Sequence, residues 1–168
     1  MNSALAPFIV LAIILVGSWI YQRFLRIDDE PTYSQIRIAD LQRLFHALRS
    51  HAEEGSFAVL TLRAADANGA AAEAYVQFSI EGGRIGLDWL LQSQRNISDR
   101  ARFVEVARAL GHAVNERQTG DVRYLRVDQG DLPHLAAALA ERLYGLGPNN
   151  AVPLMCEGFE WKNRQSAV

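Results

Sequence analysis

The feature that most constrains this chain is an uncharged run close to its N-terminus, Ala4–Tyr21, with the sequence ALAPFIVLAIILVGSWIY. An α-helix rises about 1.5 Å per residue, so the run would be roughly 27 Å long, close to the roughly 30 Å hydrocarbon core of a bilayer. Trp19 and Tyr21 would then lie at the level of the lipid head groups, where aromatic side chains are common. The sequence therefore predicts a single-pass membrane anchor in residues 1–21, with the span at 4–21.

Two alternatives explain this run less well. A cleaved signal peptide normally starts with a basic residue, and Met1–Ser3 contains none. Its only small-residue pattern, Val16–Ser18, is followed by the bulky Trp19. A helix buried in a water-soluble protein normally carries a polar stripe, which Phe8–Val16 lacks. A retained span is the favoured interpretation.

The charges beside the span predict its orientation. Arg23, Arg26 and Arg37 all follow the run, whereas only the α-amino group precedes it. Lys and Arg near a span are retained on the cytoplasmic side, and the acidic run Asp28–Glu30 contributes little to this rule. We therefore expect the anchor in the inner membrane and the C-terminal domain in the cytoplasm.

Length and charge limit what the rest of the chain can be. We interpret residues 22–37 as a juxtamembrane linker, 38–161 as one domain and 162–168 as a free tail, because about 130 residues suit one core. The 17 Lys and Arg residues are scattered and balanced by 19 Asp and Glu, which argues against nucleic acid as a partner. The single cysteine, Cys156, excludes an internal disulfide and agrees with a reducing compartment.

Hydrophobic periodicity and turn residues predict an α+β domain, in which helices pack an antiparallel sheet in the order α-β-β-β-α-β-α. The predicted elements are a helix from Ile38 to Gly55, strands Phe57–Ala64, Glu73–Glu81 and Arg84–Leu90, a helix from Asp99 to about Arg117, a strand Val122–Asp128, a helix capped by Asp131 and ended by Gly145, and a strand or extended segment in Val152–Trp161. Gly82–Gly83 favours a tight turn between antiparallel strands. Glu73–Glu81 alternates strictly, as expected for a half-buried strand.

The search for chemistry predicts no catalytic, cofactor-binding or metal-binding residue. His46 and His51 are about 140° apart on a helical wheel, so they are poor joint ligands. His112 and His134 are isolated, and a surface or partly packed position is the simpler interpretation of each. Cys156 lies among apolar residues, which indicates a small buried hydrophobe rather than a nucleophile.

Charged residues near helix starts have structural explanations as well as functional ones. Asp128 and Asp131 flank a turn into a helix, where capping explains both. Arg95, Arg100 and Arg102 could bind an anionic partner, but solvated charges are the commoner explanation of such a run.

Several segments resemble bacterial type III secretion chaperones and the chaperone-like domains allied to them. The segments are FAVLTL at Phe57–Leu62, YVQFSI followed by GGRIGLDW up to Trp89, FVEVARALGH at Phe103–His112 and LAAALAERLYGL ending at Leu146. The resemblance implies a non-enzymatic domain with one twisted antiparallel sheet, often a homodimer, that binds a protein partner. The N-terminal span and the aromatic tail in Val152–Trp161 depart from that family.

The favoured hypothesis is a single-pass, membrane-anchored protein-binding module, an adaptor or chaperone-like factor on the cytoplasmic side, whose sheet edge accepts a strand from a partner. The alternative is a membrane-tethered enzyme or small-ligand sensor, with a site assembled from dispersed residues such as Arg95, Asp88 and His112. A purely structural membrane component is the third hypothesis.

Overall fold

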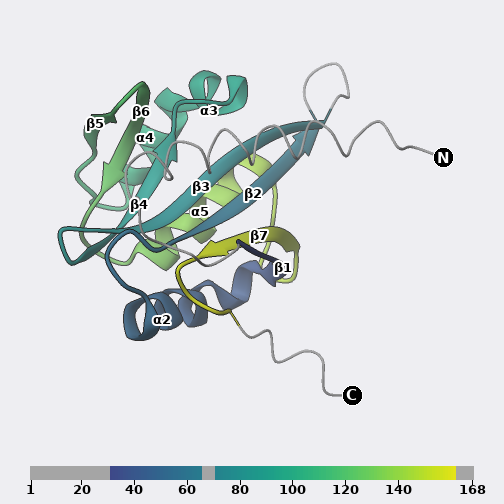
Figure 1. The fold of residues 1–168 in the computed structure, drawn as a ribbon. Helices are drawn as coiled ribbons and strands as arrows, with labels where there is room; N and C mark the ends of the chain where they lie inside the picture. The colour runs from purple at the N-terminus through teal and green to yellow at the C-terminus, as the bar shows by residue number, and fades with distance from the viewer. Residues whose placement is uncertain (1–30, 66–70, 162–168) are drawn as a thin grey trace.

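The computed structural model describes residues 31–65 and 71–161, and it confirms the α+β class (Figure 1). The strands are β1 (Thr32–Arg37), β2 (Phe57–Ala65), β3 (Ala71–Glu81), β4 (Arg84–Leu90), β5 (Asn115–Thr119), β6 (Val122–Val127) and β7 (Ala151–Glu157). The helices are the 3-10 turn η1 (Ile38–Asp40), α2 (Leu41–His51), α3 (Gln94–Ser98), α4 (Arg100–Ala109) and α5 (Leu132–Tyr144).

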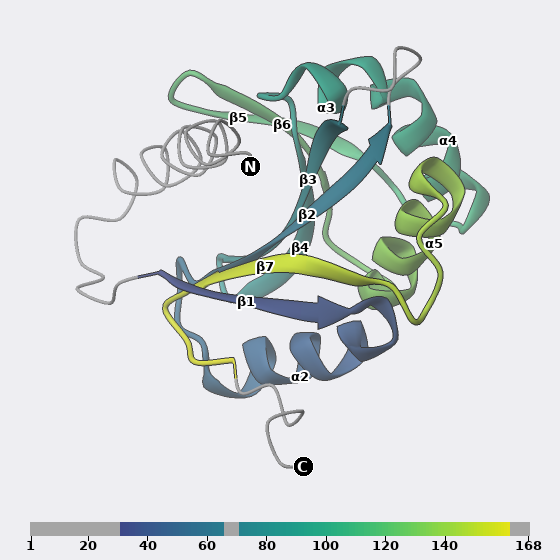
Figure 2. The same cartoon turned by 90° about the vertical axis from the view of Figure 1, so that its right-hand side faces the viewer.

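All seven described strands form one antiparallel sheet in the order β1-β7-β2-β3-β4-β6-β5. Helices α2, α4 and α5 lie on one face of this sheet, which we call the first face (Figure 2). The opposite side, called the second face, is turned toward the viewer in Figure 1, where α5 lies behind β2 and β3. Helix α3 lies beside β3, beyond the end of its pairing with β4.

The predicted meander β2-β3-β4 is confirmed, and its register follows from the Gly82–Gly83 turn. Both glycines have positive φ (59° and 70°), the backbone conformation of the tight turns that join antiparallel strands. Glu81 consequently faces Arg84 across the hairpin. The carboxylate of Glu54 accepts hydrogen bonds from both glycine N–H groups, at 2.8 and 2.9 Å, which ties the turn to the loop after α2.

The main core fills the space between the first face and the helices. Leu44 and Leu48 of α2 and Leu135 and Leu139 of α5 are fully buried there, as is Trp89 of β4. The Trp89 ring stacks on Phe103 of α4 with centroids 5.1 Å apart. The apolar residues spaced three and four apart in the predicted helices therefore form one continuous core.

Two polar strands were not predicted from the sequence. Thr32–Arg37, which was interpreted as part of the linker, forms β1 and pairs with β7 from Thr32↔Cys156 to Arg37↔Ala151. Asn115–Thr119 forms β5, although its first three residues were placed in a helix ending near Arg117. That helix ends instead at Ala109, because Gly111 turns the backbone with φ of +80° and the His112 N–H donates to the Ala107 carbonyl.

Other boundaries differ in detail. The first helix starts with η1 and ends at His51 rather than at Gly55. A start at Asp99 with Ser98 as its cap is also suggested by the sequence, but it is Ser93 that caps, five residues earlier, by accepting from the Asn96 N–H at the start of α3. At α5 the prediction is confirmed: the Asp131 carboxylate accepts from the His134 N–H at 3.0 Å, and Gly145 ends the helix in the left-handed region.

The predicted extra strand in the tail is confirmed as β7, which lies between β1 and β2 in the interior of the sheet. Phe159 is buried, and Trp161 packs against the core. None of the helices in the described residues is both long and apolar enough to cross a bilayer. The predicted span at 4–21, most of the linker and the tail 162–168 lie outside the described residues.

Candidate functional site: the second face of the sheet

The second face is built from every other residue of the strands. In β3 these residues include Tyr75, Gln77 and Ser79, whose side chains point away from the helix-covered core. The sequence pattern predicted that such residues would lie on the solvent-exposed face of a half-buried strand. That expectation is wrong, because the three side chains are only 7%, 1% and 6% exposed. Both faces of the sheet are therefore buried at β3.

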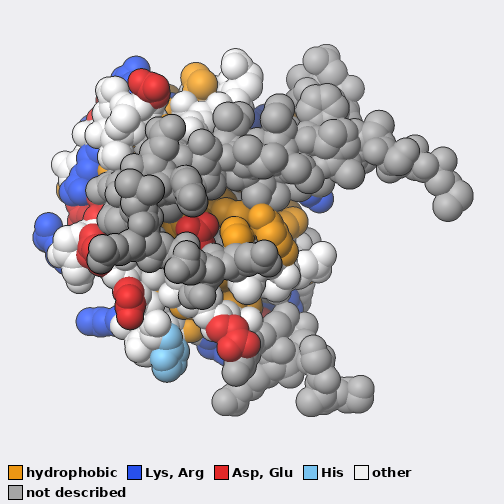
Figure 3. All heavy atoms as spheres, in the orientation of Figure 1, with side chains coloured by type: hydrophobic (Ala, Val, Ile, Leu, Met, Phe, Trp, Pro, Cys, Tyr) orange, Lys and Arg blue, Asp and Glu red, His pale blue; other side chains and the backbone are white. Residues whose placement is uncertain are grey.

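One part of the second face is apolar. A cluster of buried side chains, called the apolar band, runs across five neighbouring strands from β7 to β6. Its members are Met155, Phe57, Val59, Tyr75, Leu90, Tyr124 and Val122. Hydrophobic side chains are visible near the middle of this side of the molecule in Figure 3. Of the described helices, α2, α4 and α5 lie on the opposite side, so none of these three covers the band.

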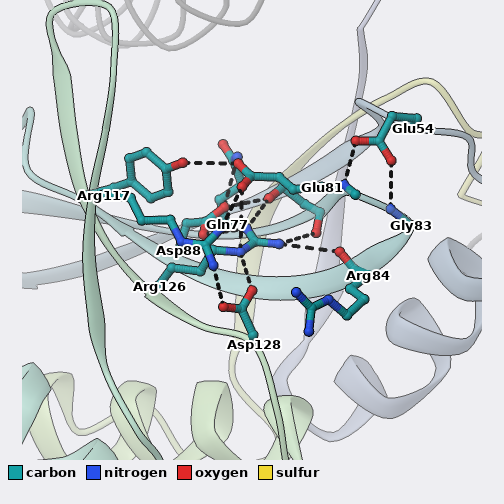
Figure 4. Close-up of polar contacts among 12 residues, drawn as sticks. Glu54, Gln77, Glu81, Gly83, Arg84, Asp88, Arg117, Arg126 and Asp128 are labelled. Atoms are coloured by element: carbon teal, nitrogen blue, oxygen red, sulfur yellow. Dashed lines mark hydrogen bonds and ion pairs between the residues drawn. The ribbon is translucent and has the colours of Figure 1, made fainter.

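The other part of the second face is a charged cluster around Arg126 of β6 (Figure 4). The Arg126 Nη1 donates to Asp88 Oδ1 and Ser79 Oγ, both at 2.7 Å, and its Nε donates to Asp128 Oδ1 at 2.6 Å. Its Nη2 reaches the backbone carbonyls of Ser79 and Arg84. The guanidinium therefore donates to oxygen acceptors on several sides, which suits a group with no exposed surface.

Further residues extend this cluster toward β5. Arg117 donates to Glu81 Oε2 at 3.1 Å and to Asp128 Oδ2 at 2.6 Å. Tyr124 donates its hydroxyl to Glu81 Oε1 at 3.2 Å, which joins the charged cluster to the apolar band. Three carboxylates, those of Glu81, Asp88 and Asp128, thus face two guanidinium groups. With every group ionised the cluster carries one excess negative charge.

Burial shifts the protonation of this cluster. Asp88 has no exposed surface, and burial raises its pKa to about 6 even though Arg126 and Ser79 favour the carboxylate. Burial also lowers the pKa of Arg126, but the charges of Asp88, Asp128 and Glu81 outweigh that effect and raise it overall. Arg126 therefore stays charged, while Asp88 takes up a proton in mildly acidic conditions.

Gly86 of β4 provides the space for the Arg126 side chain. A Cβ at this position would lie 2.2 Å from the Arg126 Cζ, well inside van der Waals contact. Gly86 lies in register with Ser79, in the row of the sheet next to Asp88. The glycine is thus needed for close packing of the guanidinium on the strand rather than for a turn.

Gln77 lies at the junction of the apolar band and the charged cluster. Its Nε2 is 3.5 Å from Asp88 Oδ2, and Val59 of β2 lies beside it in register. Its Oε1 accepts no hydrogen bond from the described part of the chain, although the side chain is only 1% exposed. An acceptor left unpaired in a buried position is costly, so this oxygen favours an occupant that brings a donor.

The isolated residues considered from the sequence have ordinary structural positions. His46, His51 and His134 are exposed, and His112 is half-buried with Nδ1 3.0 Å from the Gln129 carbonyl oxygen. Cys156 is buried on the first face, as predicted, and burial raises the pKa of its thiol to about 12. Such a thiol is protonated at neutral pH and a poor nucleophile.

The two aspartates before α5 have different roles. Asp131 caps the helix, as predicted. Asp128 does not cap it, because both of its carboxylate oxygens are engaged by Arg126 and Arg117. Capping was the wrong explanation for this residue, since the sequence alone does not show that β6 brings it beside two buried guanidinium groups.

The three residues of the alternative dispersed site have separate sets of partners. Asp88 pairs with Arg126, Arg95 pairs with Asp99 at 2.6 Å, and His112 faces Gln129. Arg102 also pairs with Asp99, and Arg100 pairs with Glu116 at 2.6 Å. The arginines near the start of α4 are therefore paired within the domain.

Two open clefts lie at the end of the sheet where β6 leads into α5. One, of about 550 Å³, is lined by residues that include Phe45, Arg49 and Leu132. The other, of about 650 Å³, brings His112 and His134 to one cleft together with Asp131, a grouping that the sequence did not predict. Among the described residues, no three His, Cys, Asp or Glu side chains group as metal ligands.

The chain matches no protein-family model, and neither a curated protein nor a solved structure matches it. The resemblance to type III secretion chaperones therefore stays a prediction. The second face is identified from the geometry alone, as the surface where a buried apolar band meets a buried charged cluster.

Proposed function

We propose that this protein is a single-pass, membrane-anchored protein-binding module, and that the second face of its sheet is the surface that receives the partner. The observation that carries the proposal is the apolar band, because α2, α4 and α5 all pack on the opposite face. A domain with one sheet normally buries one face on its helices and leaves the other polar toward water. An apolar second face is typical of a surface that another protein or segment covers.

The anchor in this proposal is Ala4–Tyr21, whose 18 uncharged residues suit one crossing of a bilayer. The arginines after the span favour a domain in the cytoplasm, at the inner membrane. The adaptor or chaperone-like role and the absence of a reaction belong to the same proposal, and the resemblance to secretion chaperones supports them.

Binding on the second face is favoured over strand addition at the edge β5. That edge strand has the sequence NERQT, and its Glu116 is paired with both Arg100 and Arg123. Charged side chains on a short edge strand discourage the pairing of a further strand. The edge strand β1 differs, because Tyr33 is 60% exposed and lies in register with Met155 of the apolar band.

Tyr33 and Ile97 provide a matched pair for testing the proposal. They are the two large hydrophobic residues that are exposed in the described part of the chain, at 60% and 49%. Tyr33 borders the second face, whereas Ile97 lies on α3. A photoreactive phenylalanine analogue is placed at each position in the full-length protein, and intact membranes are irradiated.

The proposal predicts a defined heterologous adduct from position 33 and none from position 97. Equal adducts from both positions would indicate unspecific proximity and contradict the assignment of the face. Adducts of this protein with itself alone would favour a homodimer over an adaptor.

A further inference from the structure

The burial of the apolar band requires a cover that the described helices do not provide. Val59, Tyr75 and Tyr124 of the band are 4%, 7% and 1% exposed. Helices α2, α4 and α5 lie on the first face, and α3 lies beside the end of β3. Side chains on a bare sheet face would keep more contact with water than this.

Three segments lie outside the described residues, and their chemistry differs. Residues 66–70 are a short stretch with the sequence DANGA, and residues 162–168 are the polar KNRQSAV. Only residues 1–30 contain a long apolar stretch, Ala4–Tyr21. Of the three, this stretch alone has the composition to cover a band of seven apolar side chains.

The dimensions of the band also suit this segment. The band crosses four strand spacings, which is about 19 Å. Eighteen residues in a helix reach about 27 Å, and the ten residues Gln22–Pro31 span up to about 33 Å when extended. This connection ends at Thr32 of β1, which pairs with β7, and β7 contributes Met155 to the band. The segment can therefore reach every strand of the band.

A sheet and a bilayer compete for the segment. A helix lying on the sheet would bury one side only, and Phe8–Val16 has no polar side to leave in water. A bilayer buries the whole circumference, so it is the more favourable place when it is present. The segment cannot occupy both places at once.

We propose that Ala4–Tyr21 covers the second face of the sheet in water and leaves that face when it enters a bilayer, so that anchoring exposes the partner-binding surface. The burial of the apolar band supports the covering, whereas the release rests on the proposed function. Before insertion, the covering keeps both the apolar band and the apolar segment from binding other proteins unspecifically. After insertion, the apolar band and the unpaired Gln77 oxygen become accessible.

Two thiols on neighbouring strands test this proposal within one molecule. Val59→Cys places a thiol in the apolar band, while the native Cys156 lies on the first face of the next strand, where Ala58 pairs with it. The full-length variant is made by cell-free synthesis without vesicles or with phosphatidylcholine–phosphatidylglycerol vesicles. Maleimide labelling of each thiol is followed by mass spectrometry, and flotation measures vesicle binding.

We expect the cysteine at position 59 to be protected without vesicles and to react at least about tenfold faster once the chain floats with vesicles, because labelling follows the opening of the cover. Cys156 stays unlabelled in both states if the domain remains folded. Ile14→Asp in the same background should remove protection without vesicles, since a charge is unfavourable on an apolar face. Met155→Cys is a second reporter in the band, in case Val59→Cys labels at Cys156 as well.

Fast labelling of the band without vesicles, with Cys156 protected, would overturn the covering. Protection that persists in floating chains would overturn the release. A chain that does not float with vesicles would refute the membrane anchoring of the proposed function, and therefore the release as well. The covering is tested separately, by the protection of position 59 without vesicles.

Discussion

Removal of the buried guanidinium at Arg126 should destabilise the domain strongly and in a pH-dependent way. In Arg126→Met, Asp88 loses its 2.7 Å contact with Nη1 and keeps only Ser79 Oγ, at 2.5 Å, and the distant Gln77 amide. The direct attraction at this distance is about 6 kcal/mol with an effective dielectric constant near 20. Methionine removes the desolvation cost of the arginine, so the net loss in unfolding free energy should be about 3–5 kcal/mol at pH 8.

The pH dependence of this loss follows from the carboxyl group that is left behind. Burial has already raised the pKa of Asp88 to about 6 with Arg126 present, and removal of Arg126 raises it further. Between pH 6 and that higher pKa the folded variant binds more protons than the folded wild type, so the stability difference grows as pH rises. The loss should therefore be smaller at pH 5, where Asp88 is protonated in both proteins.

The assay is urea unfolding of the full-length protein in a mild detergent, followed by far-UV circular dichroism at pH 5 and pH 8. Arg84→Met is the matched control, because Arg84 is an exposed arginine at the start of the neighbouring strand β4. It should change stability by less than about 0.5 kcal/mol. The double variant Asp88→Asn with Arg126→Met should lose less than the sum of the single losses. A loss below about 1 kcal/mol at pH 8, or the same loss at both pH values, would refute this account of the cluster.

Three further predictions concern neighbouring residues. Asp88 has a folded-state pKa of about 6, above an unfolded value of about 3.9. Between these two pH values the folded protein holds a proton that the unfolded chain releases. The contribution of Asp88 to stability therefore falls as pH rises from about 4 to 6. Urea unfolding at pH 4 and pH 7 should show the wild type losing about 2 kcal/mol relative to Asp88→Asn, and parallel pH profiles would contradict the shift. Gly86→Ala should cost about 1–3 kcal/mol, since its Cβ would meet Arg126, while Gly147→Ala, whose nearest neighbour would be 3.8 Å away, should be nearly neutral in the same thermal melt. Asn96→Ala should cost about 2–4 kcal/mol, because the Asn96 side chain pairs with both the N–H and the carbonyl of Tyr75, at 2.9 and 2.8 Å. The control is Asn149→Ala, at an exposed position. Equal melting temperatures of the two variants would show that these hydrogen bonds do not stabilise the fold.

Local patterns made much of the fold predictable. The β3–β4 hairpin followed from strict alternation and two adjacent glycines, and α5 followed from Asp131, Pro133 and Gly145. The strands β1 and β5 were missed because their sequences, TYSQIR and NERQT, are mostly polar. The pairing of β1 is decided far along the chain, because Thr32 pairs with Cys156 of β7, whereas β5 pairs with the next strand, β6.

The candidate site was harder to predict than the fold. Asp88 and Arg126 are 38 positions apart, and only the pairing of β4 with β6 places them side by side. The sequence placed Gln77 and Ser79 on a solvent-exposed face of a strand, whereas both are buried. Alternation shows that the two faces of a strand differ, but it does not show whether either face is exposed. A charged residue between apolar ones in a strand, as in Tyr124-Leu125-Arg126-Val127, was the available signal.

We propose above all that the second face is the surface that receives a partner at the membrane. The most direct measurement is quantitative recovery of the crosslinked or co-purified partner from detergent-solubilised membranes that contain the wild type, Tyr33→Ser or Ile97→Ser at equal abundance. Both substitutions remove an exposed hydrophobic side chain, so neither should disturb the core. We predict that recovery falls severalfold with Tyr33→Ser and is unchanged with Ile97→Ser. Unchanged recovery with Tyr33→Ser, or an equal fall with both variants, would contradict the central claim.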